Sequence, residues 1–496
     1  MERNIDQVVS QIFEIRSVFK GKISNQSIID LTTSLFFLKC ISDISEDKTK
    51  LISQTTDEIE IKLHHEEYTL IIPSSAQWHS LKRIRYNLGS ALDEACRELE
   101  EKNSYLYGVL SSIDLNSIVI AASNEKDLIF SYIIQKLSEI PNLKNYSDDP
   151  EFIGKVFVEL IEQTSKDLPQ WDTNYEIPES VSNLIFSLLN PKAGSKFCDP
   201  VCRSGNTFIG CLKYLKQRGK DPSGIKFFGQ ESNLHLWRLC KMNMLLNGFA
   251  DAEIKLGDLI RNPQLLSNSH LMHFDFIVSS PSFGIKNWGY EVAHYDLYNR
   301  FHYGIPPKNR GDFAYLEHMI STLNEEGKLG VVIPNGMLFR MGKEGEIRKN
   351  IIKQGIIEAV ISLPPKMYPG TSVSTSILLL NKNKEERHKD SILFIGAEKD
   401  YEKGKQQNYL KEQNIEKVIE VFRNYKEIEK YSRYVSFSEI EKNEFSLNIS
   451  LYINASMEIE AVDLRETLQK LKELGEISTK LDIKMDECLK ELGYKI

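Results

Sequence analysis

Between about Pro150 and Gly396, short runs rich in valine, isoleucine and phenylalanine alternate with segments of helical periodicity. Buried strands of a parallel sheet have this short apolar character, and the helices that connect them repeat apolar residues every three or four positions. The alternation therefore predicts an α/β fold, in which helices cover a mostly parallel sheet. The predicted strands are 196–199, 226–230, 253–256, 274–279, 329–334, 359–363 and 375–380.

The segments on either side of this region have a different character. Apolar residues recur at helical spacing before residue 150, as in Val8, Ile12 and Ile15, so we expect a helical N-terminal domain over residues 1–149. The α/β domain should then cover residues 150–400, with a C-terminal helical region over 401–496. The polar tract 381–390 has charges of both signs, and we interpret it as a solvated hairpin loop.

The end of the chain predicts a long amphipathic helix, or a pair of helices, from about Ile453. Its leucines, among them Leu464, Leu474 and Leu481, step by three or four positions with Lys and Glu between them. Such a face packs either on its own domain or on a second protein, and the pattern leaves both alternatives open.

Composition excludes several classes of protein. No run approaches the roughly 18 apolar residues of a membrane span, and residues 1–10 carry charge, so we expect a cytoplasmic protein without a membrane segment. The seven cysteines are scattered without a C-x-x-C pair, which predicts no disulfide framework and no metal site. The net charge of −8 argues against a protein that coats nucleic acid indiscriminately, so any DNA contact should be local.

Polar residues typical of nucleotide sites follow successive predicted strands. "FCDPVCRSGNTF" (197–208) is a glycine-containing turn that leads into a helix, and it holds Asp199, Arg203 and Gly205. Glu231 ends the next strand, where related folds bind ribose hydroxyls. Asp258 follows the third strand and could face an adenine amino group. Since these strand ends should meet at one edge, together they predict an adenosine-type site.

At this point the sequence resembles the modification (M) subunit of type I restriction–modification systems, an adenine-N6 DNA methyltransferase family. The resemblance spans nearly the whole chain. It rests on the following blocks: "LFFLKCISD", "IIPSSAQWHSL", "DPVCRSG", "GQESN", "KMNMLLNG", "DFIVSSPSFGIKNWG", "RFHYGIPPKNRGDFAYLEH", "GVVIPNGMLFRMGKEGEIRKNII", "SLPPKMYPGTSVSTSILLLNKNK" and "FSLNISLYI".

The resemblance implies a Rossmann-like methyltransferase domain that takes S-adenosylmethionine as cofactor and double-stranded DNA as substrate. It also implies a specificity subunit, bound through the C-terminal helix and the N-terminal domain. A second copy of the chain and a restriction or other effector subunit are further partners that it allows.

The family's catalytic loop corresponds to Ser280, Pro281, Ser282 and Phe283. In the family an Asn side chain and the following Pro carbonyl accept the two N–H groups of the flipped adenine, while the aromatic ring stacks on the base. Ser280 keeps a hydrogen-bond acceptor and Phe283 keeps the ring. Ser282 replaces a second proline, which frees the backbone where a rigid turn is expected.

Two further positions depart from the family at the cofactor site. The resemblance places Gly where this chain has Arg203, so a bulky cation faces a cofactor whose sulfonium is also positive. It places Thr where this chain has Ile177. Residues that build the fold match and residues that touch cofactor and base do not, which favours lost or altered methyl transfer.

Other polar residues carry weaker predictions. Asp312 precedes a helical segment and is interpreted as its N-cap. Two basic strips could hold DNA phosphates or simply be solvated; they comprise Arg300, His302, Lys308 and Arg310, and Arg340, Lys343, Arg348 and Lys349. Trp288 could stack on the base or pack in the core.

Two hypotheses of different classes follow. The chain is either a modification subunit that methylates adenine under a specificity subunit's guidance, or a catalytically inactive methyltransferase-like scaffold that binds DNA or partner subunits in a defence complex.

Overall fold

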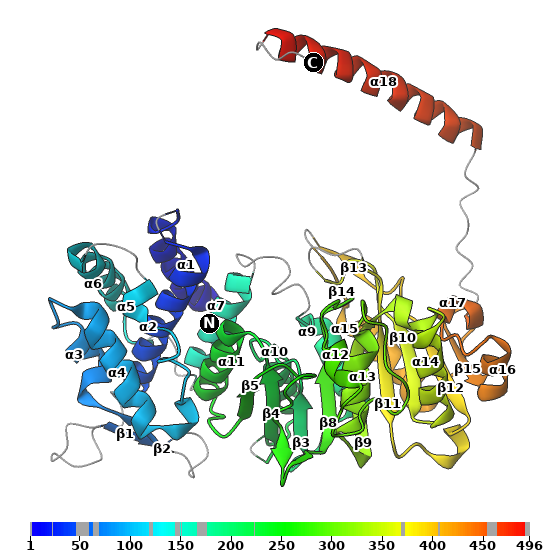
Figure 1. Ribbon diagram of the computed structural model, residues 1–496, viewed down its shortest axis with the longest axis horizontal. Helices are drawn as coiled ribbons and strands as arrows, with labels where there is room; N and C mark the ends of the chain where they lie inside the picture. The colour runs from blue at the N-terminus through cyan, green and yellow to red at the C-terminus, as the bar shows by residue number, and fades with distance from the viewer. Residues whose placement is uncertain are drawn as a thin grey trace.

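The computed structural model describes residues 2–21, 23–45, 59–62, 69–118, 123–143, 149, 151–165, 176–222, 224–368, 373–404, 407–453 and 464–491. Its centre is a nine-stranded sheet with strand order β15-β12-β10-β11-β9-β8-β3-β4-β5 (Figure 1). The strands are β3 (Lys196–Asp199), β4 (Lys226–Glu231), β5 (Glu253–Leu256), β8 (Phe274–Ser279), β9 (Leu323–Pro334), β10 (Ile357–Ser362), β11 (Thr375–Asn381), β12 (Ser391–Gly396) and β15 (Ser432–Ser436).

The sheet is mostly parallel, as the alternating sequence predicts. Strands β9, β8, β3, β4 and β5 are parallel neighbours, and β10 pairs with β12 in the same sense. Strand β11 lies antiparallel between β9 and β10, and β15 is an antiparallel edge strand beside β12. The α/β fold class is therefore confirmed.

The tract 381–390 is not a hairpin loop, so that prediction is wrong. β12 pairs with β10 on the side away from β11, and the tract crosses from one side of β10 to the other. Lys384 lies buried within the tract and donates to the carbonyls of Ile357 and Ser391, both at 2.8 Å. This lysine ties the crossing to the ends of the strands that it connects.

Helices cover both faces of the sheet because successive strand residues point to opposite sides. Leu393 and Ile395 of β12 pack in one core cluster with residues of α9, α10 and α15, whereas Ile392 and Phe394 pack in a second cluster with residues of α13, α14 and α17. These helices are α9 (Glu179–Leu189), α10 (Asn206–Gln217), α13 (Asp312–Ser321), α14 (Lys343–Lys353), α15 (Glu412–Asn424) and α17 (Ile449–Tyr452).

The N-terminal part of the chain is mainly helical, as expected, with one small addition. Strands β1 (Ile59–Lys62) and β2 (Thr69–Ile72) form an antiparallel pair beside the helices. The longer helices are α1 (Glu2–Val18), α2 (Asn25–Ser45), α4 (Leu88–Lys102) and α6 (Ser123–Glu139).

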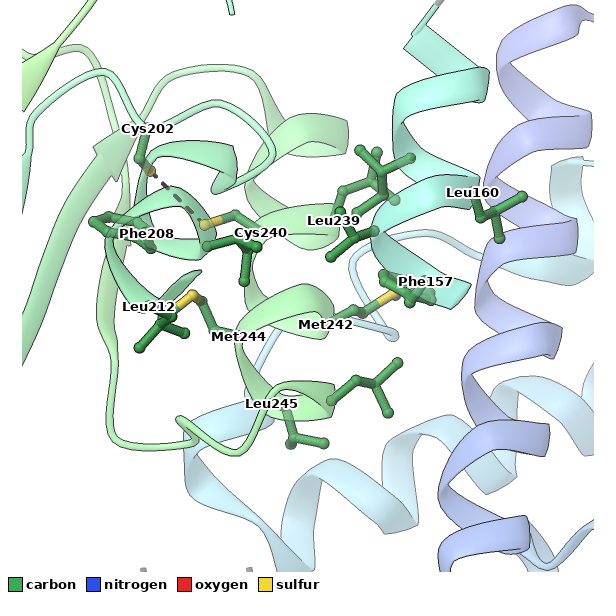
Figure 2. Packing of buried hydrophobic residues seen from close by; sticks show 14 of the residues in the cluster. Phe157, Leu160, Cys202, Phe208, Leu212, Leu239, Cys240, Met242, Met244 and Leu245 are labelled. Atoms are coloured by element: carbon green, nitrogen blue, oxygen red, sulfur yellow. Dashed lines mark hydrogen bonds between the residues drawn. The ribbon is translucent and has the colours of Figure 1, made fainter. Parts of the chain in front are cut away.

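Helix α11 (Leu234–Leu246) joins this helical part to the sheet. It packs on α2, on α7 (Phe152–Ser165) and on strands β4 and β5. Figure 2 shows its side chains Leu239 and Met242 beside Phe157 of α7, and Cys240 directed toward Cys202. Because α11 is apolar on nearly every side, it is buried between the two parts of the molecule.

A buried arginine crosses the same junction. Arg238 of α11 donates to Asp30 at 3.2 Å and to Ser34 at 2.8 Å, both on α2, and to the carbonyl of Val109. A buried guanidinium requires such partners because its desolvation is costly. The helical part is therefore fixed to the sheet by a charged contact as well as by a shared core.

Helix α18 (Leu464–Glu491) stands apart from the rest of the chain (Figure 1). Its apolar side chains Leu471, Leu474, Ile477, Leu481 and Met485 are all more than half exposed. The amphipathic helix predicted near the end of the chain is present from Leu464, while residues 454–463 and Leu492 lie outside the described residues.

Candidate functional site

The strand ends that carry the predicted site residues meet at one edge of the sheet. Strand β3 is flanked by β4 on one side and by β8 on the other, so the chain's path reverses direction at β3. In open α/β sheets, ligands bind outside the carboxyl ends of the strands at such a switch point. The topology alone therefore marks the loops after β3 and β8 as the place to look for a site.

A cavity of about 220 Å³ lies between these loops, and we call it the β3 pocket. It contains four of the predicted site residues, Ile177, Asp199, Arg203 and Ser280. Its full lining is Glu176, Ile177, Asp199, Val201, Cys202, Arg203, Asn206, Thr207 and Ser280.

Arg203 is the residue that most affects the shape of the β3 pocket. Its backbone adopts the left-handed conformation (φ 49°), which costs an L-residue about 1 to 2 kcal/mol and which glycine adopts freely. The residue is 7% exposed, and its Nη2 donates to the Ser282 hydroxyl at 3.0 Å and to the Ser280 carbonyl at 3.4 Å. The guanidinium thus bridges the loops after β3 and β8 across the pocket.

Gly205 follows in the same turn and requires glycine for two reasons. Its φ is 88°, and a Cβ there would lie 2.9 Å from the Cys240 sulfur. The Cys202 and Cys240 sulfurs are themselves 4.0 Å apart and not bonded as a disulfide (Figure 2). The turn therefore packs tightly on α11 before α10 begins.

Glu231 and Asp258 are both engaged by nearby backbone groups. Glu231 is buried, and its carboxylate accepts the N–H groups of Arg203 at 3.0 Å and Asn233 at 2.7 Å. Asp258 accepts the N–H groups of Ile260 and Arg261 and pairs with the Arg261 guanidinium at 3.0 Å. Neither carboxylate lines the β3 pocket, and each keeps acceptor capacity beyond these contacts.

Two carboxyl groups do line the pocket, and sequence reasoning missed one of them. Asp199 accepts from the Ser279 hydroxyl and the Val201 N–H, and burial raises its pKa to about 6. Glu176 accepts from Ser204 and from Asn206, and burial raises its pKa as well. Glu176 directly precedes the predicted residue Ile177, and that proximity is the only signal that could have identified it.

The loop after β8, residues 280–284, holds the other predicted residues and is called the β8 loop below. Ser280 and Pro281 are buried, whereas Ser282 and Phe283 are partly exposed. The Ser280 hydroxyl lies 3.3 Å from the Tyr368 hydroxyl, and the Phe283 ring meets the Tyr368 ring edge-on at 5.9 Å.

Tyr368 was not among the predicted site residues. It follows β10, whose carboxyl end lies at the same edge as that of β9 because the intervening β11 is antiparallel to both. Burial raises the pKa of its hydroxyl, so Tyr368 is neutral and can hydrogen-bond to Ser280 in either direction.

Trp288 and Arg300 are both buried. Trp288 is 1% exposed, donates to the Pro307 carbonyl at 3.0 Å and packs on Phe301, so packing in the core, one of the two alternatives for this residue, is confirmed. Arg300 pairs with Asp296 at 2.7 Å, so the prediction that it belongs to an exposed basic strip is wrong. Neither residue can reach a base or a phosphate.

Arg348 and Asp312 also differ from expectation. Arg348 is buried and donates to the carbonyls of Met337, Arg340 and Phe445, which removes it from the basic strip. Gly311 is the N-cap of α13, and Asp312 is the first helical residue. The Asp312 carboxylate instead accepts the Gly284 N–H at 2.6 Å, which holds the end of the β8 loop.

Within the described ranges, no group of three or more His, Cys, Asp or Glu side chains could hold a metal ion. Among the helices of those same ranges, none has the length and apolar character needed to cross a bilayer.

The residues present fit the expected cofactor only in part. Gly205 and the acidic strand ends are typical of an adenosine site. The Arg203 guanidinium occupies part of the β3 pocket beside these groups, and its positive charge opposes that of the S-adenosylmethionine sulfonium.

Comparison with known families and proteins gives a consistent result. Residues 148–461 match the N-6 DNA methylase family model, and residues 8–137 match the model of the HsdM N-terminal domain. The chain is 31% identical over 411 residues to the type I restriction enzyme MjaVII methylase subunit of Methanocaldococcus jannaschii, covering 80% of this chain and 68% of that one.

Two further matches extend over most of the molecule. The HindI methylase subunit of Haemophilus influenzae is 28% identical over 458 residues, which cover 86% of this chain and all of that one. The structure of a type I restriction–modification methyltransferase subunit from Streptococcus thermophilus superposes with a TM-score of 0.75 at 23% identity, covering 90% of this chain and 99% of that chain.

Proposed function

Because the chain belongs to the N-6 DNA methylase family, as a modification subunit of type I restriction–modification systems, we propose that it acts on the N6 amino group of adenine in double-stranded DNA. The methyl donor in this proposal is S-adenosylmethionine, and the place of action is the cytoplasm. The observation that carries the proposal is the convergence of the β3 pocket and the β8 loop at the switch point of the sheet.

The β8 loop supplies the groups that an extruded adenine requires. An adenine amino group can leave its conjugation with the ring only if both N–H groups are accepted. The Ser280 hydroxyl and the Pro281 carbonyl are the acceptors in this proposal, and the Phe283 ring stacks on the base. The Tyr368 hydroxyl lies 3.3 Å from the Ser280 hydroxyl and can accept its O–H. The Ser280 oxygen then keeps its own lone pairs free to accept an N–H of the adenine.

A specificity subunit is the partner that we propose. The relatives are named methylase subunits of restriction enzymes, so each is one component of a larger enzyme. Helix α18 offers an apolar face whose Leu474 and Leu481 are 65% and 61% exposed, and exposed leucines at helical spacing are typical of a helix that packs on a partner. The N-terminal helices provide a second contact in this proposal. A second copy of the chain and a restriction subunit complete the proposed assembly.

The position of Arg203 favours a second candidate function. Its guanidinium is hydrogen-bonded to Ser282 and fills part of the β3 pocket, and the same assembly could bind DNA without transferring methyl groups. In that case the chain is a scaffold that keeps the modification subunit's contacts but not its chemistry.

One pair of measurements separates the two candidates. Calorimetric titration of the full chain with S-adenosylmethionine tests donor binding, and digestion of exposed DNA followed by mass spectrometry tests for N6-methyladenine. Saturable binding together with N6-methyladenine supports the enzyme. Absence of both, with DNA binding intact, supports the scaffold, and failure to bind DNA at low salt argues against both.

A further inference from the structure

The residues of the two basic strips do not form continuous exposed strips on the surface of the fold. Arg300 and Arg348 are buried and paired, whereas Arg310 and Arg340 keep 38% and 31% of their side chains exposed. Although these two arginines are far apart in sequence, they meet at one carboxylate. Arg310 Nη1 lies 3.1 Å from Glu344, and Arg340 Nη1 lies 3.5 Å from the same side chain.

Buried carboxylates hold both guanidinium groups in place. The side chains of Glu344 and Asp312 are each 3% exposed, and Arg340 also contacts Asp312 at 3.3 Å. A buried carboxylate without its cation would be strongly destabilising, so the arginines cannot swing away freely. Their orientation is fixed before any ligand arrives, which reduces the entropy that binding would cost.

The arginine pair lies directly beside the β8 loop. Gly311, next to Arg310, donates its N–H to the Ile285 carbonyl at 2.9 Å, and Asp312 accepts the Gly284 N–H. Arg340 follows β9, whose carboxyl end lies beside that of β8 because the two strands are parallel. The exposed side chains Phe339 and Met341 flank it.

A glycine allows Arg340 to take this position. A Cβ on Gly336 would lie 2.5 Å from the Arg340 Cζ, so the guanidinium rests flat against the Gly336 backbone. The φ of Gly336 is not in the left-handed region, so alanine could adopt the backbone conformation but would displace the guanidinium.

We propose that Arg310 and Arg340 together bind one phosphodiester of the DNA backbone next to the adenine that enters the β8 loop. A guanidinium has five N–H donors in a planar fork that matches phosphate oxygens, and the carboxylate contacts use the Nη1 group of each arginine. Asp312 links this phosphate site to the β8 loop, since it contacts both Arg340 and Gly284. The inference rests on the proposed DNA-binding function and names the residues that carry its local phosphate contact.

The test measures how binding of the full chain to a short fluorescein-labelled duplex of mixed sequence depends on salt. The plot of log K against log salt should become less steep by about 0.9 for each phosphate that the protein no longer neutralises. We expect the double substitution Arg310→Gln with Arg340→Gln, which leaves that one phosphate without either guanidinium, to reduce the slope by this amount and to weaken binding on the order of 10-fold at moderate salt. Gly336→Ala, which removes no charge, should weaken binding in the same direction.

The matched control is Arg433→Gln. Arg433 is also partly exposed, at 44%, and paired with a glutamate, but it lies on the edge strand β15. Arg433→Gln should leave the slope of log K against log salt unchanged. Arg340→Lys keeps the positive charge and should preserve the slope, and circular dichroism confirms that each variant is folded.

The outcomes separate this inference from the function beneath it. If the folded double variant Arg310→Gln with Arg340→Gln has the same salt slope as Arg433→Gln, the phosphate site is wrong although DNA binding stands. If the unmodified chain does not bind the duplex at low salt, the proposed DNA contact of this subunit fails and the phosphate site fails with it.

Discussion

Replacing Arg203 with glycine should open the β3 pocket to S-adenosylmethionine. Two unit charges about 5 Å apart repel each other by roughly 3 kcal/mol at an effective dielectric constant near 20, so removing the guanidinium should raise affinity for the positively charged cofactor on the order of 100-fold. The variant's own stability should change little. Relief of left-handed strain, about 1 to 2 kcal/mol, offsets much of the charged hydrogen bond to Ser282 that the variant lacks, about 1.5 to 3 kcal/mol.

Isothermal titration with two ligands provides the assay. S-adenosylhomocysteine has no sulfonium charge, so it separates charge repulsion from lack of space. Arg203→Gln keeps most of the bulk and the left-handed backbone but no charge. If repulsion dominates, Arg203→Gln should bind S-adenosylmethionine nearly as well as Arg203→Gly, and the unmodified chain should prefer S-adenosylhomocysteine.

Thermal denaturation gives an independent readout. At a ligand concentration 100 times its Kd, binding to the folded state adds about 2.7 kcal/mol of stability. Arg203→Gly should show this shift at ligand concentrations that leave the unmodified chain unchanged. The reasoning is refuted if the unmodified chain and Arg203→Gly bind S-adenosylmethionine with equal affinity, because Arg203 would then leave the pocket at no cost.

Three other perturbations test separate parts of the structure. Arg238→Met leaves the Asp30 carboxylate buried without its guanidinium and should lower the free energy of unfolding, measured by urea denaturation, by about 3 kcal/mol. A decrease of less than about 1 kcal/mol would contradict the role of this ion pair at the junction. Burial raises the pKa of Glu317 to about 9, so between about pH 5 and 8 the folded state holds a proton that the unfolded state releases. The free energy of unfolding should therefore fall by about 1.4 kcal/mol for each pH unit of increase in this range, and Glu317→Gln should remove that dependence. Leu474→Glu with Leu481→Glu should leave the melting temperature unchanged because both side chains are exposed, yet abolish co-purification with the specificity subunit; retained co-purification would place the contact elsewhere.

The strands of the sheet could be predicted because their signal is local. Runs such as 274–279 and 375–380 are apolar over the length of a strand, and each forms one. The neighbour of each strand could not be predicted, because pairing depends on residues distant in sequence. The tract 381–390 resembled a hairpin loop for this reason, although β12 crosses to the far side of β10.

The site residues show the same difference between local signals, which the sequence reveals, and contacts between distant segments, which it does not. Asp199 ends a predicted strand, Ser280 directly follows another, and Arg203 lies in the turn after the first; the three meet in the β3 pocket. Tyr368 was missed because it reaches the β8 loop only through the antiparallel insertion of β11. Arg300 looked like a DNA contact because its partners, the carbonyls of Leu259 and Ile260, are 41 and 40 positions earlier in the chain.

The junction at α11 also limits how this protein could exchange parts with its relatives. Phe157 and Leu239 pack together in a core that continues from Val8 to Tyr431, and Arg238 reaches across it to α2. A chimera whose α2 lacks a carboxylate at the position of Asp30 would leave this buried cation without its counter-ion. Successful recombinants should therefore inherit α2, α7 and α11 from one parent, as a single heritable block.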